Sequence, residues 1–424
     1  MRLCLFEDGG VANLEPLTLT RPVFQLLCGL GPLAGKHCRY FRPTSLGVLV
    51  RPYLAPLVRT LFPSIRVNDL DWLRSDTTLL VNGRWLPPAD PLDEVPGPGV
   101  ALIDGDVAWA VIGPQRLTYL SLNTLDDCLA TWKATLPKRP AGGRLLTYPW
   151  QLIEENAAQI GQDYGRLRPL ATADRPGCTV VGPRERLRLD PTAQLDPLVV
   201  ADTRGGPVVV DQGAVVHAFT RLEGPCYVGP GTHLLGAKVR AGTSLGPNCR
   251  VGGEVEASIF QGHANKYHDG FVGHSYVGEW VNLGAGTQVS DLRNDYGQVT
   301  VTIQGEAVET GQTKVGSFLG DHTKTGLGTL LNTGTVTGIF CQLLPTGRFL
   351  PKYVPSFCSV WNGQLAPHDD LAALLKTAER VMRRRGVALG PALAEVYRSL
   401  HRQTATARYR AVSERPPLRL RRPA

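Results

Sequence analysis

Hydrophobic residues recur every six positions through the second half of the chain, and glycine often follows them. The step runs through Val210, Val216, Leu222, Val228 and Leu234, then Val239, Leu245 and Val251, then Phe271, Val277, Leu283 and Val289, and less regularly from Val315 to Ile339. A repeat of six residues matches neither the period of an α-helix nor that of a simple strand. It therefore predicts stacked coils with three short faces per turn, a parallel β-helix. Glycine would occupy the corners of such coils.

The first 170 residues have a different pattern, in which short apolar runs alternate with helix-like stretches. The predicted strands include Leu46–Val50, Thr78–Val81 and Val107–Ile112, and the predicted helices include Leu54–Leu61 and Asn123–Leu136. This alternation is typical of an α/β domain.

A third pattern begins after the coils. Leu371, Leu374, Leu375, Ala378 and Met382 form one apolar helical face within Asp370–Arg402, which is interrupted near Gly386 and at Gly390-Pro391. From Leu371 onward there are 13 Lys and Arg against 3 Asp and Glu, whereas the whole chain carries +8. The tail therefore makes the protein basic. It could meet the phosphates of coenzyme A, nucleic acid or an acidic neighbouring subunit. A solvated helical cap is favoured, and no nucleic-acid motif accompanies the charge.

Composition limits the class of protein. The chain has 424 residues, 43% of them hydrophobic, which suits two or three globular domains. No stretch approaches 18 apolar residues, and acidic residues appear by Asp8, so neither a membrane span nor a signal peptide is expected and a cytoplasmic location is predicted. The nine cysteines are scattered without a Cys-x-x-Cys pair, which predicts reduced, mostly buried thiols.

Two polar segments interrupt the coils, Gln261–Gly270 and Ser290–Gly311. A loop expelled from a solenoid costs little extra closure entropy as it lengthens, so such loops are suited to binding. They flank His274 on both sides, which makes this histidine the first candidate for chemistry.

Several motifs together resemble the GlmU family of bifunctional N-acetylglucosamine-1-phosphate uridyltransferases/glucosamine-1-phosphate acetyltransferases, in a divergent bacterial form. The motifs are Gly273-His274, Gly284–Thr287, Asn294–Gly297, Leu14–Pro22, Val81–Gly83, Tyr148–Ile153, His268–Phe271 and Gly320–Gly326. The resemblance spans about residues 1–356. It implies a nucleotidyltransferase-like, Rossmann-related domain over 1–170 and a left-handed β-helix acyltransferase domain over 176–356. A basic, mostly helical tail over 357–424 would follow.

The resemblance implies acetyl transfer from acetyl-CoA to an amino-sugar phosphate, with His274 as the base. Histidine suits this role because its ordinary pKa lies near neutrality, and the amine must lose a proton as it attacks the thioester. The alternative is a histidine that only packs at a coil corner. Lys324 and Thr325, in the coil after Asp321, are the implied acetyl-CoA contacts.

The acceptor sugar phosphate is assigned to two cations and three polar side chains near His274. Lys266 and Arg293 would hold the phosphate, because an anion is bound well by a point charge and a forked donor. Tyr276, Asn294 and Tyr296 would contact the sugar. His263 and His268, with Asp269 and His274, could instead imitate a metal cluster, but their spacings do not define ligand geometry.

Nucleotidyl transfer by the first domain depends more on the resemblance than on motifs. The usual Gly-x-Gly-Thr-Arg loop is absent, and Asp8–Gly10 and Leu17–Pro22 take its place. Arg21, Thr18, Thr20 and Asn82 are the candidate nucleotide contacts, with an ion-pair role as the alternative for Arg21. An active domain would use Mg²⁺. Asp104 and Asp106 could hold the metal, but Asp104-Gly-Asp106 favours a β-turn.

The sequence thus predicts an acetyltransferase acting on glucosamine-1-phosphate, with possible UTP-dependent formation of UDP-N-acetylglucosamine. The resemblance also implies a homotrimer whose acetyl-transfer site is shared between subunits. Three alternatives stay open. The acceptor could be another amino sugar or sugar nucleotide, the first domain could transfer a different nucleotide, or the chain could be a non-catalytic regulatory subunit.

Overall fold

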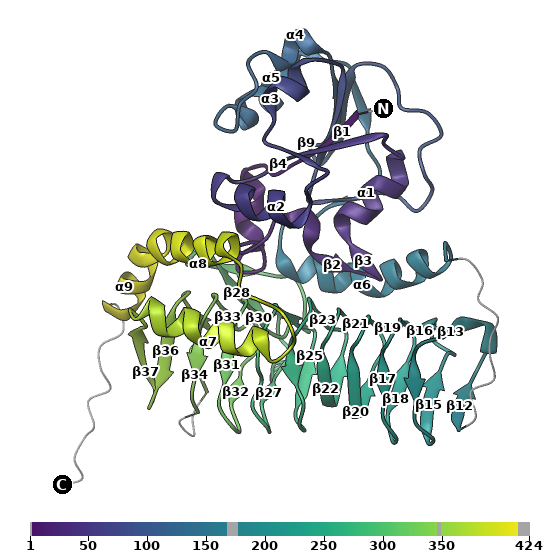
Figure 1. Ribbon diagram of the computed structural model, residues 1–424, viewed down its shortest axis with the longest axis vertical. Helices are drawn as coiled ribbons and strands as arrows, with labels where there is room; N and C mark the ends of the chain where they lie inside the picture. The colour runs from purple at the N-terminus through teal and green to yellow at the C-terminus, as the bar shows by residue number, and fades with distance from the viewer. Residues whose placement is uncertain (1, 168–176, 346–348, 414–424) are drawn as a thin grey trace.

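A computed structural model describes residues 2–167, 177–345 and 349–413 of the chain. An α/β domain sits on the side of a long β-helix, and C-terminal helices pack where the two meet (Figure 1). Within the described residues, every helix is too short or too polar to span a bilayer.

The N-terminal domain is built on a mixed sheet in the order β10-β8-β9-β6-β1-β4-β5. Its strands are β1 (Arg2–Phe6), β4 (Ser45–Leu49), β5 (Arg66–Val67), β6 (Thr78–Asn82), β8 (Gly99–Ile103), β9 (Asp106–Ile112) and β10 (Lys138–Pro140). Strands β6, β1, β4 and β5 run parallel, whereas β9 pairs antiparallel with β6 and with β8. The buried runs of β1 and β6 are almost wholly apolar, as expected for strands covered on both faces.

Six α-helices, one small hairpin and one further pair of short antiparallel strands also belong to this domain. They are α1 (Leu33–Phe41), α2 (Ala55–Leu61), α3 (Leu70–Arg74), α4 (Pro114–Leu117), α5 (Leu125–Thr135) and α6 (Pro149–Tyr164), with β2 (Leu27–Cys28) paired to β3 (Gly31–Pro32) and β7 (Trp85–Leu86) to β11 (Arg144–Leu145). Every strand and helix named from the sequence in this region is present, so the α/β prediction is confirmed.

The β-helix has three rows of short strands, one on each face. The first row is β13 (Leu187–Leu189), β16 (Val208–Val210), β19 (Cys226–Val228), β21 (Thr243–Leu245), β23 (Ile259–Phe260), β26 (Tyr276–Val277), β30 (Phe318–Leu319), β33 (Val336–Thr337) and β35 (Tyr353–Val354). Its strands pair parallel from coil to coil, for example Phe260 with Val277 and Val277 with Leu319. We call this row the first face.

The other two rows share two long strands that bend around a corner. The second face is β14 (Gln194–Leu195), β17 (Val215–Val216), the start of β20 (His233–Val239), the start of β22 (Arg250–Glu256), β24 (Asn265–Lys266), β31 (Lys324–Thr325), β34 (Gln342–Leu343) and β36 (Cys358–Trp361). The third face is β12 (Cys178–Val181), β15 (Val199–Asp202), β18 (Arg221–Glu223), the ends of β20 and β22, β25 (Phe271–Gly273), β27 (Gln288–Val289) and β32 (Leu330–Leu331). The coils continue through β36, beyond the predicted limit at 356.

Most of the hydrophobic residues that recur every six positions point to the inside of the coils. Val216, Leu234, Val251 and Leu283 are all buried in one cluster along the axis. Phe271 departs from this pattern, because its neighbour Val272 is the buried residue on β25, and Leu327 in the less regular part of the repeat is exposed. The period of six therefore predicts the architecture and most of the inward positions.

One corner of the β-helix carries a ladder of aromatic rings. In successive coils, the residue at the corner after the first face has a left-handed backbone and carries a ring. These residues are His263, Trp280, His322, Phe340 and Phe357. His263 stacks on Trp280 with ring centroids 4.1 Å apart, and His322 stacks on Phe340 at 4.6 Å. Tyr397 of a C-terminal helix closes over the ladder, its hydroxyl 3.0 Å from His322 Nε2.

Helix α6 joins the two domains and packs on the first face (Figure 1). Asn156 of α6 donates to the Gly242 carbonyl at 2.8 Å and accepts from Gly29 N–H at 2.7 Å. Apolar residues of both domains form one core here, including Leu27, Trp150, Ile259 and Phe318. The junction is therefore a fixed interface and not a flexible linker.

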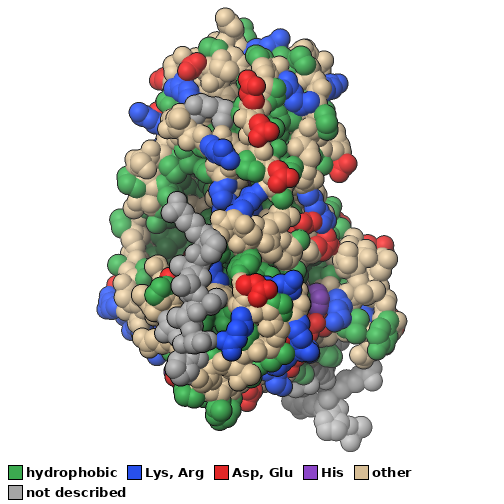
Figure 2. All heavy atoms as spheres, turned by 90° about the vertical axis from the view of Figure 1, so that its right-hand side faces the viewer, with side chains coloured by type: hydrophobic (Ala, Val, Ile, Leu, Met, Phe, Trp, Pro, Cys, Tyr) green, Lys and Arg blue, Asp and Glu red, His purple; other side chains and the backbone are tan. Residues whose placement is uncertain are grey.

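The tail forms three helices, α7 (Leu371–Arg383), α8 (Pro391–Gln403) and α9 (Ala405–Ser413). The predicted helical composition and the interruption near Gly386 and Gly390 are confirmed. Leu374, Met382 and Tyr397 are buried, so the tail caps the molecule by packing. Figure 2 shows the end of the β-helix near β12, where lysine and arginine side chains alternate with acidic ones.

An antiparallel hairpin, β28 (Thr300–Ile303) with β29 (Glu306–Glu309), occupies the longer expelled loop, and β37 (Gln364–Pro367) pairs antiparallel with β36. Val301 and Ile303 pack into the domain junction, and Gln304 donates to Asn13 at 2.9 Å.

All nine cysteines are free and seven are buried, as predicted.

Candidate functional site

His274 lies at the corner between the third and first faces, directly after β25. Its Nδ1 is 2.7 Å from Oδ2 of Asp291, a largely buried residue at the start of the expelled loop. Because an ionised carboxylate can only accept, this contact places the proton of a neutral imidazole on Nδ1. The lone pair of Nε2 is then available to accept a proton.

Local backbone features hold this pair together. His274 has left-handed backbone (φ 44°), and its N–H donates to the Glu256 carbonyl of the previous coil at 3.0 Å. Glycine is required at the preceding position, 273, because a Cβ there would lie 2.3 Å from Asp291 Oδ2. The expelled loop also returns beside the pair, since Val315 N–H donates to the Asp291 carbonyl at 2.8 Å.

A pocket of about 390 Å³ opens beside His274, and we call it the histidine pocket. It is lined by α6 residues Trp150, Ile153, Glu154 and Ala157, by corner residues Ala241, Gly242, Ala257 and His274, and by loop residues Gln312, Thr313, Lys314 and Val315. Its walls are mostly apolar, with one acid and one base beside the histidine. This combination suits a small polar ligand with an apolar ring face.

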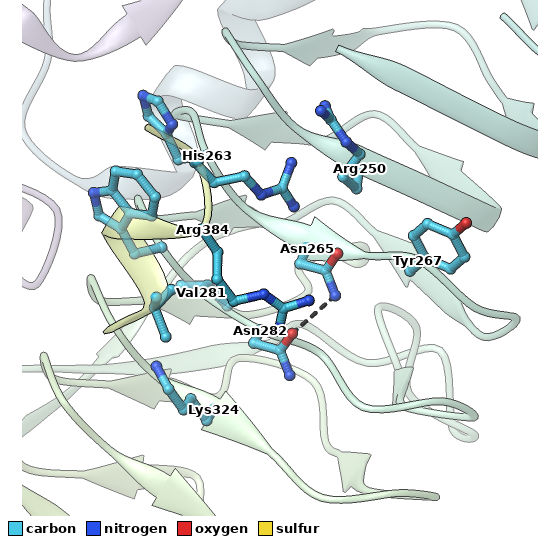
Figure 3. Close-up of a pocket in the computed structure, with 11 residues that line it drawn as sticks. Arg250, His263, Asn265, Tyr267, Val281, Asn282, Lys324 and Arg384 are labelled. Atoms are coloured by element: carbon cyan, nitrogen blue, oxygen red, sulfur yellow. Dashed lines mark hydrogen bonds between the residues drawn. The ribbon is translucent and has the colours of Figure 1, made fainter. Parts of the chain in front are cut away.

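A second pocket of about 560 Å³ lies on the second face of the β-helix, beneath the end of α7, and we call it the cationic pocket (Figure 3). It is lined by Arg250, His263, Asn265, Tyr267, Trp280, Val281, Asn282, Lys324, Val381, Arg384 and Arg385. Asn265, Asn282 and Lys324 come from successive coils, and Asn265 donates to Asn282 at 2.8 Å.

The cations of this pocket lack acidic partners, since none of its described lining residues is Asp or Glu. Burial lowers the pKa of Lys324 to about 8, and its Nζ donates only weakly to the His322 carbonyl, at 3.3 Å. Burial and the charge of Arg385 lower the pKa of Arg250, and burial also lowers that of Arg385. Uncompensated positive charge in a concave site favours an anionic ligand.

Two predicted acceptor contacts are engaged inside the protein. Lys266 pairs in register with Val251, an inward position, and its Nζ donates to the carbonyls of Gly252 and His268 at 2.9 and 3.1 Å. Burial lowers its pKa to about 8. The Tyr276 hydroxyl lies in the domain junction, where Leu27 N–H donates to it at 3.0 Å, and burial raises its pKa. Neither side chain lines the histidine pocket or the cationic pocket.

The other predicted contacts have mixed positions. Arg293, Asn294 and Tyr296 lie on the loop after Asp291, outside the lining of both pockets, and Arg293 Nε donates to Asp295 at 2.8 Å. They stay a prediction. Lys324 lines the cationic pocket as expected for an anion contact. Thr325 is buried, and its Oγ1 accepts from Gly284 N–H at 2.9 Å, so it faces the coil interior.

The four nucleotide candidates of the first domain are all buried and bonded within the protein. Arg21 pairs with Asp321 of the β-helix and lies 3.3 Å from Glu279, while Thr20 donates to Asp321 at 2.7 Å. Thr18 donates to the Val11 carbonyl at 3.3 Å, and Asn82 donates to Asp8 at 2.7 Å. Arg21 therefore forms an ion pair between the domains, the alternative that the sequence left open, and its contact with a nucleotide stays a prediction.

The two aspartates predicted to hold magnesium lie on a surface turn. Asp104 and Asp106 lie exposed at the tip of the β8–β9 hairpin, where Asp104 and Gly105 have left-handed backbone. This is the β-turn that the sequence favours. In the part of the chain that the structure describes, no three metal-binding side chains converge, so His263, His268, Asp269 and His274 form no metal-binding cluster there.

Sequence reasoning did not find Asp291, Lys314, Trp150 or Glu154. Asp291 belongs to a loop that the sequence marks as polar, but nothing local pairs it with His274. The other three come from a distant helix and from the far end of the loop, so only the fold brings them to the histidine.

Comparison with known proteins agrees with this architecture. Residues 3–169 match a family model described as sugar nucleotidyl transferase. The chain is 32% identical over 148 residues to a bifunctional sugar-1-phosphate nucleotidylyltransferase/acetyltransferase of Sulfurisphaera tokodaii, covering 33% of this chain and 36% of the relative. It is 38% identical over 132 residues to a bifunctional protein GlmU of Azorhizobium caulinodans, covering 29% of this chain and 28% of the relative.

A bifunctional protein GlmU of Methanocaldococcus jannaschii is 36% identical over 109 residues, 25% of this chain and 26% of the relative. In each case the match spans about a third or less of the curated relative. Taken with the α/β domain and the β-helix, these likenesses show that the chain is similar, over part of its length, to bifunctional GlmU proteins, and that residues 3–169 match a sugar nucleotidyl transferase model.

Proposed function

We propose that this protein transfers an acetyl group from acetyl-CoA to the amine of an amino-sugar phosphate, glucosamine-1-phosphate in the first instance. The observation that carries the proposal is the His274–Asp291 pair, of which His274 lines the histidine pocket. Nε2 of His274 would take the proton from the amine as its nitrogen attacks the thioester carbonyl. Asp291 would hold the ring and stabilise the imidazolium that results.

The cationic pocket supports the donor half of the proposal. Acetyl-CoA carries several phosphate charges, and Lys324, Arg250, Arg384 and Arg385 offer cations without acidic partners. This assigns part of the basic tail to coenzyme A, because Arg384 and Arg385 follow α7. No described residue lines both pockets, and they lie on different faces of the same coils.

This separation favours an assembled enzyme. A donor held on the second face of one subunit would meet His274 of another subunit, as in the homotrimer that the resemblance implies. The proposal therefore includes a homotrimer with a shared acetyl-transfer site. Sedimentation or light scattering of the purified protein measures this directly, and a stable active monomer would contradict it.

We also propose nucleotidyl transfer by the first domain, forming UDP-N-acetylglucosamine from UTP and the acetylated product. Its support is the family match over residues 3–169 and the names of the bifunctional relatives. Arg21, Thr18, Thr20 and Asn82 are bonded to other groups of the protein, and a nucleotide would have to replace those partners to contact them.

Two separate assays test the two activities. Free thiol is followed with acetyl-CoA and glucosamine-1-phosphate, and pyrophosphate is followed with UTP, Mg²⁺ and N-acetylglucosamine-1-phosphate. Thiol release alone would leave the first domain without its transfer activity, and both signals would establish a bifunctional enzyme. Failure of both would favour another acceptor or a regulatory subunit.

Asp291→Asn is expected to lower kcat for acetyl transfer by about tenfold or more, because an amide can present the wrong group to Nδ1 and cannot stabilise imidazolium. KM for acetyl-CoA should not change, since Asp291 lines neither pocket. Asp295→Asn, on the exposed part of the same loop, is the control. Equal kcat in the two variants would remove Asp291 as the residue that positions His274.

The donor site is expected to lose affinity at alkaline pH. Lys324 has a folded-state pKa lowered to about 8, so its charge is present below this pH and lost as the pH rises through it. We expect kcat/KM for acetyl-CoA to fall by about tenfold there, the equivalent of one charge-assisted hydrogen bond. Lys324→Arg should keep its charge and abolish the fall. An identical decline in Lys324→Arg would separate Lys324 from donor binding.

A further inference from the structure

Helix α6 presents one face to the histidine pocket, although it belongs to the segment that matches the sugar nucleotidyl transferase family. Its lining residues are Trp150, Ile153, Glu154 and Ala157. The spacing i, i+3, i+4, i+7 places them along a single helical stripe. The β-helix supplies the opposite wall through the stacked corners that end with His274.

The helix is fixed firmly enough to act as a wall. Its first turn is capped, because the Gln151 side chain accepts from Thr147 and Tyr148 N–H at 2.6 and 3.1 Å. Asn156 bonds to Gly242 and to Ser244 Oγ, at 2.8 and 3.0 Å. Near the other end, Asp163 accepts from Lys36 at 2.6 Å. These contacts set both the rotation of α6 and its distance from the corners.

The wall has the chemistry of a sugar site. Trp150 stacks on Tyr148 with centroids 4.5 Å apart and planes 9° apart, so the indole is held in one orientation. An indole and an isoleucine can cover the apolar face of a pyranose ring. Glu154 can accept from a hydroxyl or amine, and Arg144 holds its carboxylate at 2.7 Å. Lys314, on the loop side, lies 3.6 Å from Glu256 in a partly exposed ion pair and can turn its ammonium group to a phosphate.

We propose that α6 is the acceptor-recognition wall of the acetyl-transfer pocket, so that a helix of the nucleotidyl transferase segment determines which amino-sugar phosphate is acetylated. The inference rests on the proposed acetyltransferase function and goes beyond it. The acceptor site is then built from both domains. A β-helix without α6 would keep His274 but lose the surface that orients the sugar.

Two alanines of α6 provide a matched test. Ala157 lines the pocket and is close to Gly242, whereas its neighbour Ala158 is exposed and lines neither pocket. Ala157→Leu should raise KM for glucosamine-1-phosphate by about tenfold or more, since added methylenes occupy ligand space. KM for acetyl-CoA should stay within about twofold of wild type, because the donor is assigned to the other pocket. Ala158→Leu should match wild type in both.

Calorimetric binding of glucosamine-1-phosphate without donor gives a second readout, and Glu154→Gln, which keeps the shape of the wall, gives a second variant. Ala157→Leu and Glu154→Gln should both weaken binding of glucosamine-1-phosphate, and Ala158→Leu should not.

Three outcomes would contradict part or all of this proposal. If the wild type is active, and if Ala157→Leu and Glu154→Gln leave acceptor KM and binding unchanged, α6 is not the acceptor-recognition wall but the acetyltransferase proposal stands. A wild type that binds the acceptor through α6 without releasing thiol would instead retain the wall and overturn the proposed reaction. A wild type that neither binds nor turns over the acceptor would overturn both.

Discussion

His274→Ala is expected to lower the turnover number for acetyl transfer by about 10²-fold or more, the usual contribution of a general base. The amine of an amino sugar must lose a proton as it becomes an amide, and Nε2 of His274 is the group that the Asp291 contact leaves free to take it. Thiol release at saturating acetyl-CoA and glucosamine-1-phosphate measures the effect.

The matched control is His268→Ala, which removes an exposed histidine of the preceding loop that lines neither pocket. This variant should turn over like wild type. KM for acetyl-CoA should be unchanged in both, because neither side chain belongs to the cationic pocket. A His274→Ala enzyme with wild-type turnover would leave the histidine a packing role at a coil corner, the alternative that the sequence left open.

The sequence predicts the coils well because their geometry repeats. Each inward position recurs at a fixed interval, so Val216, Leu234 and Val251 can be recognised before any contact is known. His274 is also recognisable, because its motif interrupts a regular pattern. Both predictions depend on residues that lie close together along the chain.

The predicted contacts that are bonded within the protein have the opposite character. Lys266 is read as a phosphate contact because it is a cation near His274, but one coil earlier its partner is Val251, which marks an inward position. If the inward positions of the regular coils are extended into the irregular coil, Lys266 falls on an inward position. No such signal exists for Arg21, whose partner Asp321 is 300 residues away, or for Trp150, which reaches the histidine pocket only because α6 packs on the first face.

The Arg21–Asp321 pair therefore joins two motifs that the sequence assigned to separate ligands. Asp321 accepts from Arg21, from Thr20 at 2.7 Å and from Glu279 N–H at 2.8 Å, in a region buried between the domains. Burial alone would lower the pKa of Arg21, but the charges of Asp321 and Glu279 raise it above its ordinary value. Arg21 thus stays charged inside the protein and depends on its partners.

Asp321→Ala is expected to lower the free energy of unfolding by about 3–5 kcal/mol, because it leaves a buried guanidinium without its main counter-charge. Urea denaturation followed by circular dichroism measures this loss. The control is Asp295→Ala, which breaks an ion pair with Arg293 that is exposed to solvent and should leave the denaturation midpoint close to that of wild type.

A double variant distinguishes the lost charge pair from lost packing. Arg21→Met combined with Asp321→Ala removes both charges, so the second substitution should cost less stability when the first is already present. Strictly additive losses would mean that Asp321 stabilises the junction through its bonds to Thr20 and Glu279 and not through Arg21. Additivity would also reopen a ligand-binding role for the arginine. Strong coupling would identify the Leu14–Pro22 motif as the segment that fixes the first domain on the β-helix.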